Sequence, residues 1–257
     1  MKNLVTLRFM LVSLFAIMSM AVSAGIIEYS TDDGFRYGLD TEAKTAVLAK
    51  YNGSATEVSI SESVTYEGVV YSVTSLGAEC FYFCSSLTSI TIPSSVTSLG
   101  NLCFSICSSL ASINIPSSVT SLGYLCFYLC SSLTSINIPS SVTSLGEECF
   151  GGCSSLKTVT CEIPAPISAN SIFSGDPINK ATLYVPEASL NSYKTTSPWS
   201  GFGTILAIKS SGIETNTVGT SATMDAIYNL EGKRIGGIKR GMNILRMSDG
   251  TTRKIMK

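Results

Sequence analysis

One segment of 23 residues is written four times in succession between positions 73 and 164. The copies follow one another without gaps: VTSLGAECFYFCSSLTSITIPSS at 73–95, VTSLGNLCFSICSSLASINIPSS at 96–118, VTSLGYLCFYLCSSLTSINIPSS at 119–141 and VTSLGEECFGGCSSLKTVTCEIP at 142–164. A fixed period of this length is typical of a solenoid, in which each repeat forms one coil and buries its apolar face against the next. The repeats therefore predict a stack of coils for this part of the chain.

Each repeat contains the spacing Leu-x-x-Ile-x-Ile or a close variant of it, as in Leu110, Ile113 and Ile115. This spacing is typical of a leucine-rich repeat strand, whose alternate side chains point into the coil. Pro116 then ends the strand, because proline has no N–H to donate to a sheet. Between the glycine of each repeat and the Cys-Ser-Ser that follows there is room for about two helical turns. We therefore expect a β-rich solenoid with short helices or turns on its convex side, a short irregular helix being the favoured filling.

The residues between the apolar strand positions are expected to face solvent. They are small, polar and uncharged, which suits either a solvated sheet or a shallow docking surface for a glycan or an extended polypeptide. The lack of aromatic anchors argues against tight binding. The candidate binding residues are Ser89, Thr91, Ser112, Asn114, Ser135, Asn137, Thr158 and Thr160.

The side of the coil opposite the strand varies most between repeats. Its large apolar residues either form an exposed stripe that contacts another protein or pack between adjacent coils. The candidates for apolar contact are Tyr82, Phe83, Ile106, Tyr128 and Leu129.

Eight of the nine cysteines form two columns. The first column is Cys80, Cys103, Cys126 and Cys149, and the second is Cys84, Cys107, Cys130 and Cys153. Equivalent residues of neighbouring coils are expected about 4.8 Å apart, the spacing of paired strands, which overlaps the low end of disulfide Cα separations. Parallel side chains are poor geometry for a bridge, and cysteine is a good small core residue. Buried thiols and one or more disulfides both remain open, whereas stacked C-x-x-x-C copies without histidine do not resemble a closed zinc site.

The repeat resembles the BspA-like class of bacterial leucine-rich repeats, on the strength of the pattern VTSLGxxCFxxCSSLTSIxIPSS. That family commonly has Ala-Phe where this chain has Cys-Phe, for example at Cys80-Phe81. The resemblance covers about residues 60–164 and implies an exported or surface protein. It says little about the ligand, because such proteins share a scaffold and differ in what they bind.

The charge and composition exclude several functions. The net charge is −1 and the chain has no histidine, so bulk electrostatics do not indicate nucleic acid. Without histidine, a hydrolase of the Ser–His or Cys–His type is excluded. The few carboxylates of the repeats are scattered, and no glycine loop for phosphate occurs. We therefore expect no enzyme, no cofactor and no metal.

Residues 1–24 resemble a secretory signal peptide. Lys2 and Arg8 form a charged start, an apolar run follows from 9 to 22, and Val22-Ser23-Ala24 suits cleavage before Gly25. The apolar run is shorter than the roughly 20 residues of a membrane span. No membrane span is therefore expected in the mature chain.

The regions flanking the repeats are expected to close the stack and to add one further module. Residues 25–72 contain short antiparallel strands and an entry repeat, which suits an N-terminal β cap. Past Pro164 the literal repetition is lost, and residues 165–209 are expected to form a C-terminal cap in which the single tryptophan, Trp199, plugs the core. Residues 210–223 are rich in Ser, Thr and Gly and indicate a linker.

The last segment, residues 224–257, differs from the rest in charge. It holds eight Lys or Arg against three acids, and strands are expected at 226–230, 242–247 and 251–256. The text IYNLEGKRI…KRGMNILRMSDGTTRKIMK resembles the C-terminal sorting domains of the type IX secretion system of Gram-negative bacteria. Under that resemblance the segment is an address, and a purely structural β module is the alternative.

Together these features predict a leucine-rich repeat protein that is secreted or held on the outer-membrane surface of a Gram-negative bacterium after cleavage near Ala24. Its expected role is binding or adhesion to a host or matrix protein or to a glycan. The alternative is a structural surface protein that associates with copies of itself and has no specific small ligand.

Overall fold

The computed structural model describes residues 25–167, 171–208, 224–228, 234–235, 242–247 and 252–256. The chain divides into two compact units, residues 1–207 and 208–257. The signal peptide expected at 1–24 and the linker expected at 210–223 lie outside the described residues.

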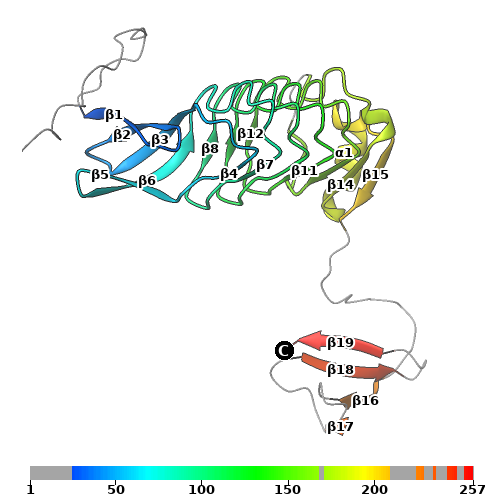
Figure 1. Ribbon diagram of the computed structural model, residues 1–257. Helices are drawn as coiled ribbons and strands as arrows, with labels where there is room; N and C mark the ends of the chain where they lie inside the picture. Colours follow the sequence, from blue (N-terminus) through cyan, green and yellow to red (C-terminus); the bar gives the residue numbers. More distant parts are fainter. Residues whose placement is uncertain are drawn as a thin grey trace, which may run out of the picture. The chain divides into compact units, whose positions relative to one another are not determined.

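The first unit is a β-solenoid whose coils are stacked from β1 at one end to β15 and α1 at the other (Figure 1). One side of the stack is a parallel sheet in the order β9-β11-β13-β14-β15. The register pairs equivalent residues of successive coils, such as Ile113 with Ile136 and Ile136 with Val159. The strands are β9 (Ser112–Asn114), β11 (Ser135–Ile138), β13 (Thr158–Cys161), β14 (Thr182–Val185) and β15 (Thr204–Ala207); one coil earlier, β7 (Ser89–Thr91) pairs in parallel with β4 (Glu57–Ser59).

A second sheet runs along another side of the coils and continues into the N-terminal cap. Its parallel part pairs two-residue strands, so that Leu76, Leu99, Leu122 and Leu145 enter the core at equal heights. The antiparallel cap strands agree with the sequence prediction, and β5 and β6 form a hairpin that turns at Glu67-Gly68. The strands are β1 (Ile26–Ser30), β2 (Phe35–Asp40), β3 (Thr45–Tyr51), β5 (Ser63–Tyr66), β6 (Val69–Leu76), β8 (Ser98–Leu99), β10 (Ser121–Leu122) and β12 (Ser144–Leu145).

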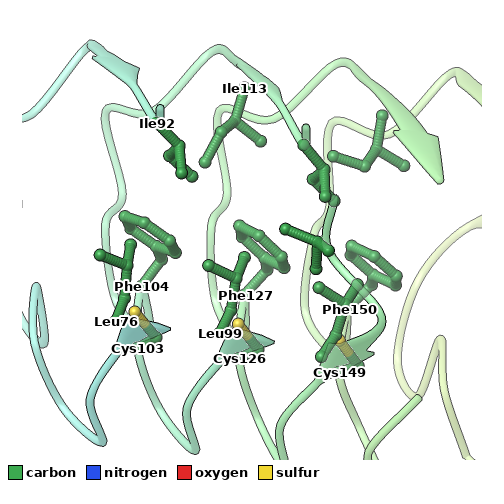
Figure 2. Packing of buried hydrophobic residues seen from close by; sticks show 14 of the residues in the cluster. Leu76, Ile92, Leu99, Cys103, Phe104, Ile113, Cys126, Phe127, Cys149 and Phe150 are labelled. Carbon is green, nitrogen blue, oxygen red and sulfur yellow. The ribbon is translucent and has the colours of Figure 1, made fainter. Parts of the chain in front are cut away.

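Stacked phenylalanine rings fill the centre of the solenoid, with the first cysteine column beside them (Figure 2). The rings of Phe81, Phe104, Phe127, Phe150 and Phe173 follow one another with centroids 5.2 to 5.6 Å apart and interplanar angles of 4° to 15°. Nearly parallel rings at this separation are offset-stacked, which is favourable beyond the area they bury. The aliphatic residues and the first cysteine column share one interior that excludes solvent, since all of them are buried.

Of the two structures expected on the convex side, short helices or turns, the structure has turns in all four repeats. The preference for a helix was wrong. The reason lies in the backbone hydrogen bonds: the N–H groups of Leu102, Phe104 and Ile106 donate to carbonyls of the next coil over 2.7 to 2.8 Å. In a helix these N–H groups would bond within the segment. Because the coils use them to hold one another, a helix is excluded here.

The coil geometry continues beyond Pro164, where the literal repetition of the sequence ends. Strands β14 and β15 extend the parallel sheet, and Phe173 extends the ring stack to Trp199. Trp199 is fully buried, and its Nε1–H donates to the Ile167 carbonyl at 3.0 Å, as expected of a plug. The helical elements of this end are α1 (Leu190–Thr195) and three 3-10 helices, Ile178–Lys180, Glu187–Ser189 and Trp199–Gly201.

The second unit contains an antiparallel sheet in the order β17-β16-β18-β19. The strand expected at 242–247 has those bounds, the one expected at 226–230 lies two residues earlier, and the one expected at 251–256 begins one residue later. The short β17 was not expected. The bounds are β16 (Met224–Tyr228), β17 (Arg234–Ile235), β18 (Met242–Met247) and β19 (Thr252–Met256).

Gly123→Ala tests how tightly the coils must approach. A Cβ at this position would lie 2.5 Å from Asn101 N and Gly100 C, which are backbone atoms of the preceding coil. We expect the free energy of unfolding to fall by about 1–3 kcal/mol or more, the cost of overpacking, measured by urea denaturation. The control is Gly38→Ala, whose Cβ would meet only Ile26 Cγ2 at 3.7 Å. Equal losses in the two variants would contradict the expectation.

Candidate functional site

The eight candidate residues of the strand face lie on the strands of four successive coils, and we call them the polar ladder. Six of them belong to β9, β11 and β13 of the five-stranded parallel sheet, whereas Ser89 and Thr91 belong to β7, which pairs with β4. Their neighbours along each strand, such as Ile113 and Ile136, are buried, while Asn114 is exposed and Asn137 is half-buried. The register joins the rows across coils. One row contains Ser89, Ser112, Ser135 and Thr158, and the other contains Thr91, Asn114, Asn137 and Thr160.

Both rows continue past the last repeat recognised in the sequence. Thr158 pairs with Thr182 and Thr160 with Tyr184, which in turn pairs with Leu206. Tyr184 is half-buried and Leu206 is 44% exposed. These residues were not predicted as part of the face, because the literal repetition of the sequence ends at Pro164. The outward face therefore does carry an aromatic side chain, at its C-terminal end.

A carboxylate lies beside the polar ladder. Asn137 Nδ2 donates to Glu162 Oε1 at 3.2 Å, whereas Asn137 Oδ1 is shielded from solvent and has no hydrogen-bond partner. Hydroxyls, amides, one carboxylate and one phenol offer both donors and acceptors. This chemistry suits an uncharged polar ligand, such as a sugar or an extended backbone, rather than an anion.

The apolar candidates lie on the turns of the coils, and we call them the turn edge. Phe83 is 64% exposed, Tyr82 and Leu129 are each 39% exposed, and Ile106 and Tyr128 are half-buried. Tyr124, which is 46% exposed, lies on the same series of turns and was not among the predicted contacts. The five candidates therefore do not form a uniformly exposed stripe.

The turn edge has an unusual backbone. Phe83, Ile106 and Leu129 have φ values of 63°, 62° and 57°, in the left-handed region that costs an L-residue about 1–2 kcal/mol. In the fourth repeat this position is Gly152, and a Cβ there would lie 2.7 Å from Leu129 Cδ2. Leu129 therefore leans over the next coil, so part of its surface serves packing between coils.

The thiols are core groups and not reactive ones. All nine cysteines are free, and Cys84 is the one that is only half-buried. Burial raises the pKa of the Cys107 thiol to about 12 and also raises that of Cys130. Since the thiolate is the nucleophile, these groups stay protonated at neutral pH. They act as hydrogen-bond donors: Cys107 Sγ lies 3.2 Å from the Phe81 carbonyl oxygen.

The part of the chain that the structure describes has neither a metal-binding cluster nor a membrane-spanning helix. No group of three or more His, Cys, Asp or Glu side chains in these ranges is arranged to hold a metal ion. No helix in them is long and apolar enough to cross a membrane.

Comparison with known structures places this architecture among leucine-rich repeat proteins. A leucine-rich repeat protein from Bacteroides capillosus is 29% identical over 52% of this chain and 98% of its own, with a TM-score of 0.48. A leucine-rich cell surface protein from Faecalibacterium prausnitzii is 21% identical over 88% of this chain and 60% of its own, with a TM-score of 0.51. The pneumococcal vaccine antigen PcpA is 18% identical over 71% of this chain and 48% of its own, with a TM-score of 0.53.

The sequence matches a family model, and no curated protein matches it. The family model described as the BspA type leucine rich repeat region matches residues 69–194 in six copies. Six copies agree with the coils that continue beyond Pro164 in the structure. No enzymatic family is indicated. Residues 69–194 of this chain thus belong to the BspA-type leucine-rich repeat family.

Proposed function

We propose that this chain is a surface leucine-rich repeat protein that binds a protein or a glycan outside the cell. The observation that carries the proposal is the outward face of the parallel sheet: its rows stay uncharged from Ser112 to Thr204 and from Asn114 to Leu206. A regular row of hydroxyls and amides offers hydrogen bonds at every coil. An extended ligand can use several of them at once, so that individually weak contacts add up.

Tyr184 gives this face an anchor that the repeats themselves lack. It is half-buried, which limits the entropy lost when the ring is fixed by a ligand, and it is paired with Thr160 in the next strand. Tyrosine is among the residues that carry most of the energy in binding surfaces. A sugar ring or an aromatic side chain stacked on Tyr184 would also reach the amide of Asn137, two strands away.

The expected export of the chain rests on residues 1–24 and on the relatives. One structural relative is described as a cell surface protein and another as a vaccine antigen. Both descriptions support a position outside the cell. The outer-membrane surface or the medium as the destination, after cleavage near Ala24, is proposed from the sequence of residues 1–24.

Asn114→Lys together with Asn137→Lys tests the polar ladder. Two lysines add bulk and positive charge to the centre of two rows of uncharged side chains, so we expect binding to fall at least about tenfold, or 1.4 kcal/mol. The measurement is a screen of immobilised glycans and matrix proteins, followed by titration of the ligands found. The control is Ser117→Lys with Ser140→Lys, which adds the same charges at exposed turns of the same coils. Equal loss of binding in the control, or none in the ladder variant, would overturn the proposal.

The C-terminal module is the proposed sorting signal of a type IX secretion system. Its sheet belongs to the second compact unit of the chain, which suits a signal that the secretion system recognises independently of the repeats. Deletion of residues 224–257 is expected to leave the protein in the periplasm, detected by fractionation and by its resistance to protease added to whole cells. The control is deletion of residues 212–221, which shortens the linker and keeps the module. Surface delivery of the first variant at the normal level would refute this role.

Self-association is the second candidate function, and the exposure of Phe83 and Tyr82 on the turn edge favours it. Exposed apolar side chains that lie close together on a monomer often mark a contact site. In this role the turn edges of two copies would cover one another, leaving the polar ladder free.

Phe83→Ser together with Leu129→Ser tests self-association. We expect the concentration at which the chain associates, measured by static light scattering, to rise at least about tenfold, because two apolar contacts are lost. The control is Val70→Ser, which removes an apolar side chain that is 58% exposed on the N-terminal cap. A variant that folds normally and associates like the control would argue against this role.

A further inference from the structure

Asp176 occupies the place that cysteine occupies in the coils before it. It follows Phe173 by three residues, as Cys153 follows Phe150. Its N–H donates to the Phe173 carbonyl at 3.2 Å, and the Cys153 N–H donates in the same way to the Phe150 carbonyl at 3.4 Å. The second cysteine column therefore continues into the next coil with a carboxyl group in place of a thiol.

Three thiols of this column, those of Cys107, Cys130 and Cys153, make equivalent hydrogen bonds. Each donates to the carbonyl of the phenylalanine in the preceding coil, and the next acceptor in this series is the Phe150 carbonyl. A carboxyl group can continue the series only when it is protonated, since the ionised form has no hydrogen to donate. The three bonds are Cys107 Sγ to Phe81 O at 3.2 Å, Cys130 Sγ to Phe104 O at 3.2 Å and Cys153 Sγ to Phe127 O at 3.3 Å.

The surroundings of Asp176 favour the neutral form. Both carboxyl oxygens are shielded from solvent and make no hydrogen bond, and an unpaired buried charge is costly. Burial raises the pKa of Asp176 to about 7, and it outweighs the lowering effect of the nearby Cys153 and Gly152 N–H groups. Those two N–H groups donate to the carbonyls of Phe150 and Ser174 and not to the carboxyl group. The titratable neighbour is the Cys153 thiol, whose pKa is raised chiefly by burial and further by the charge of Asp176. That thiol therefore stays protonated throughout the relevant range.

We infer that Asp176 is a pH-responsive latch on the C-terminal coils. When protonated, it completes the donor column on the Phe150 carbonyl. When ionised, it places an uncompensated charge between the coils and loosens them. The coil that Asp176 leads into contains β14, so the latch acts on the part of the outward face that carries Tyr184.

The direction of the pH effect follows from the two states of the group. An unfolded aspartate has the ordinary value of 3.8, and the folded value lies above it. The folded coils therefore bind the proton more tightly than the unfolded ones. The stabilisation is complete below about pH 3.8 and is lost as the pH rises through about 7.

The first test is a carboxyl-carbon NMR titration of the full chain. We expect the Asp176 resonance to titrate with a midpoint near 7, and a midpoint below about 5, close to that of a free aspartate, would overturn the inference. The second test is native-state hydrogen exchange at the amides of residues 171–185, corrected for the intrinsic rate. Between pH 5 and pH 7 the opening constant of the wild type is expected to rise with pH, by at most about tenfold per unit.

Matched variants separate the latch from a general effect of pH. Asp176→Cys restores the side chain of the column, and Asp176→Asn supplies a donor that does not titrate, so both should make the opening constant independent of pH over this interval. Glu187→Gln removes an exposed carboxylate of the same end and should keep the wild-type slope. The inference is overturned if Asp176→Cys opens with the pH dependence of the wild type, or if Glu187→Gln abolishes it.

Discussion

The whole solenoid depends on a fixed register between one coil and the next. Backbone hydrogen bonds join equivalent residues of successive coils at the parallel sheet, at the two-residue strands and at the turns. The phenylalanine rings stack within the same register. Because each coil contacts only its neighbours, stability is distributed along the stack. The end coils have a neighbour on one side only and unfold most easily unless they are capped. The ends are closed by aromatic residues: the Tyr51 ring lies 5.2 Å from that of Phe81, and Trp199 meets Phe173 edge-on at 5.5 Å.

This register decides which positions are free for function. Most inward positions hold buried apolar residues or cysteine at matching heights, and a Cβ at Gly100, Gly123 or Gly146 would collide with the backbone of the preceding coil, so substitutions at these positions are costly. The turns give their N–H groups to the next coil and hold apolar residues in the left-handed region. Side chains such as Leu129 are therefore partly committed to the neighbouring coil. The outward strand positions are not constrained in this way. That is the physical reason to look for the ligand on the polar ladder before the turn edge.

The structure could be predicted from the sequence where the same pattern recurs in every repeat. The period of 23 predicted the stack, the alternation in the strands predicted which of Ile113 and Asn114 is buried, and the cap strands followed from ordinary turn chemistry. The two-residue strands were not predicted, because a pair such as Ser98–Leu99 is too short to show an alternation of apolar and polar residues. The turns were mistaken for helix because spacing alone does not show where N–H groups donate. Beyond Pro164 the residues change but the pairing between coils continues. Phe173 still follows Phe150 by one period and stacks on it, whereas the sequence of β14 no longer matches the strand pattern of the repeats. Tyr184 was missed for that reason.

The same loss of literal repetition explains why a titratable group occurs where it does. In the interior coils a thiol fills the column position, and burial raises the pKa of this thiol far above neutral pH. The thiols of these coils therefore do not change their charge near neutral pH. A carboxyl group in the middle of the stack would weaken two interfaces, because each coil contacts two others. At Asp176 the column ends, and the following coil is closed by Trp199 rather than by another repeat. A group whose charge depends on pH is thus tolerated at this end, where its ionisation loosens the last coils and leaves the preceding ones intact.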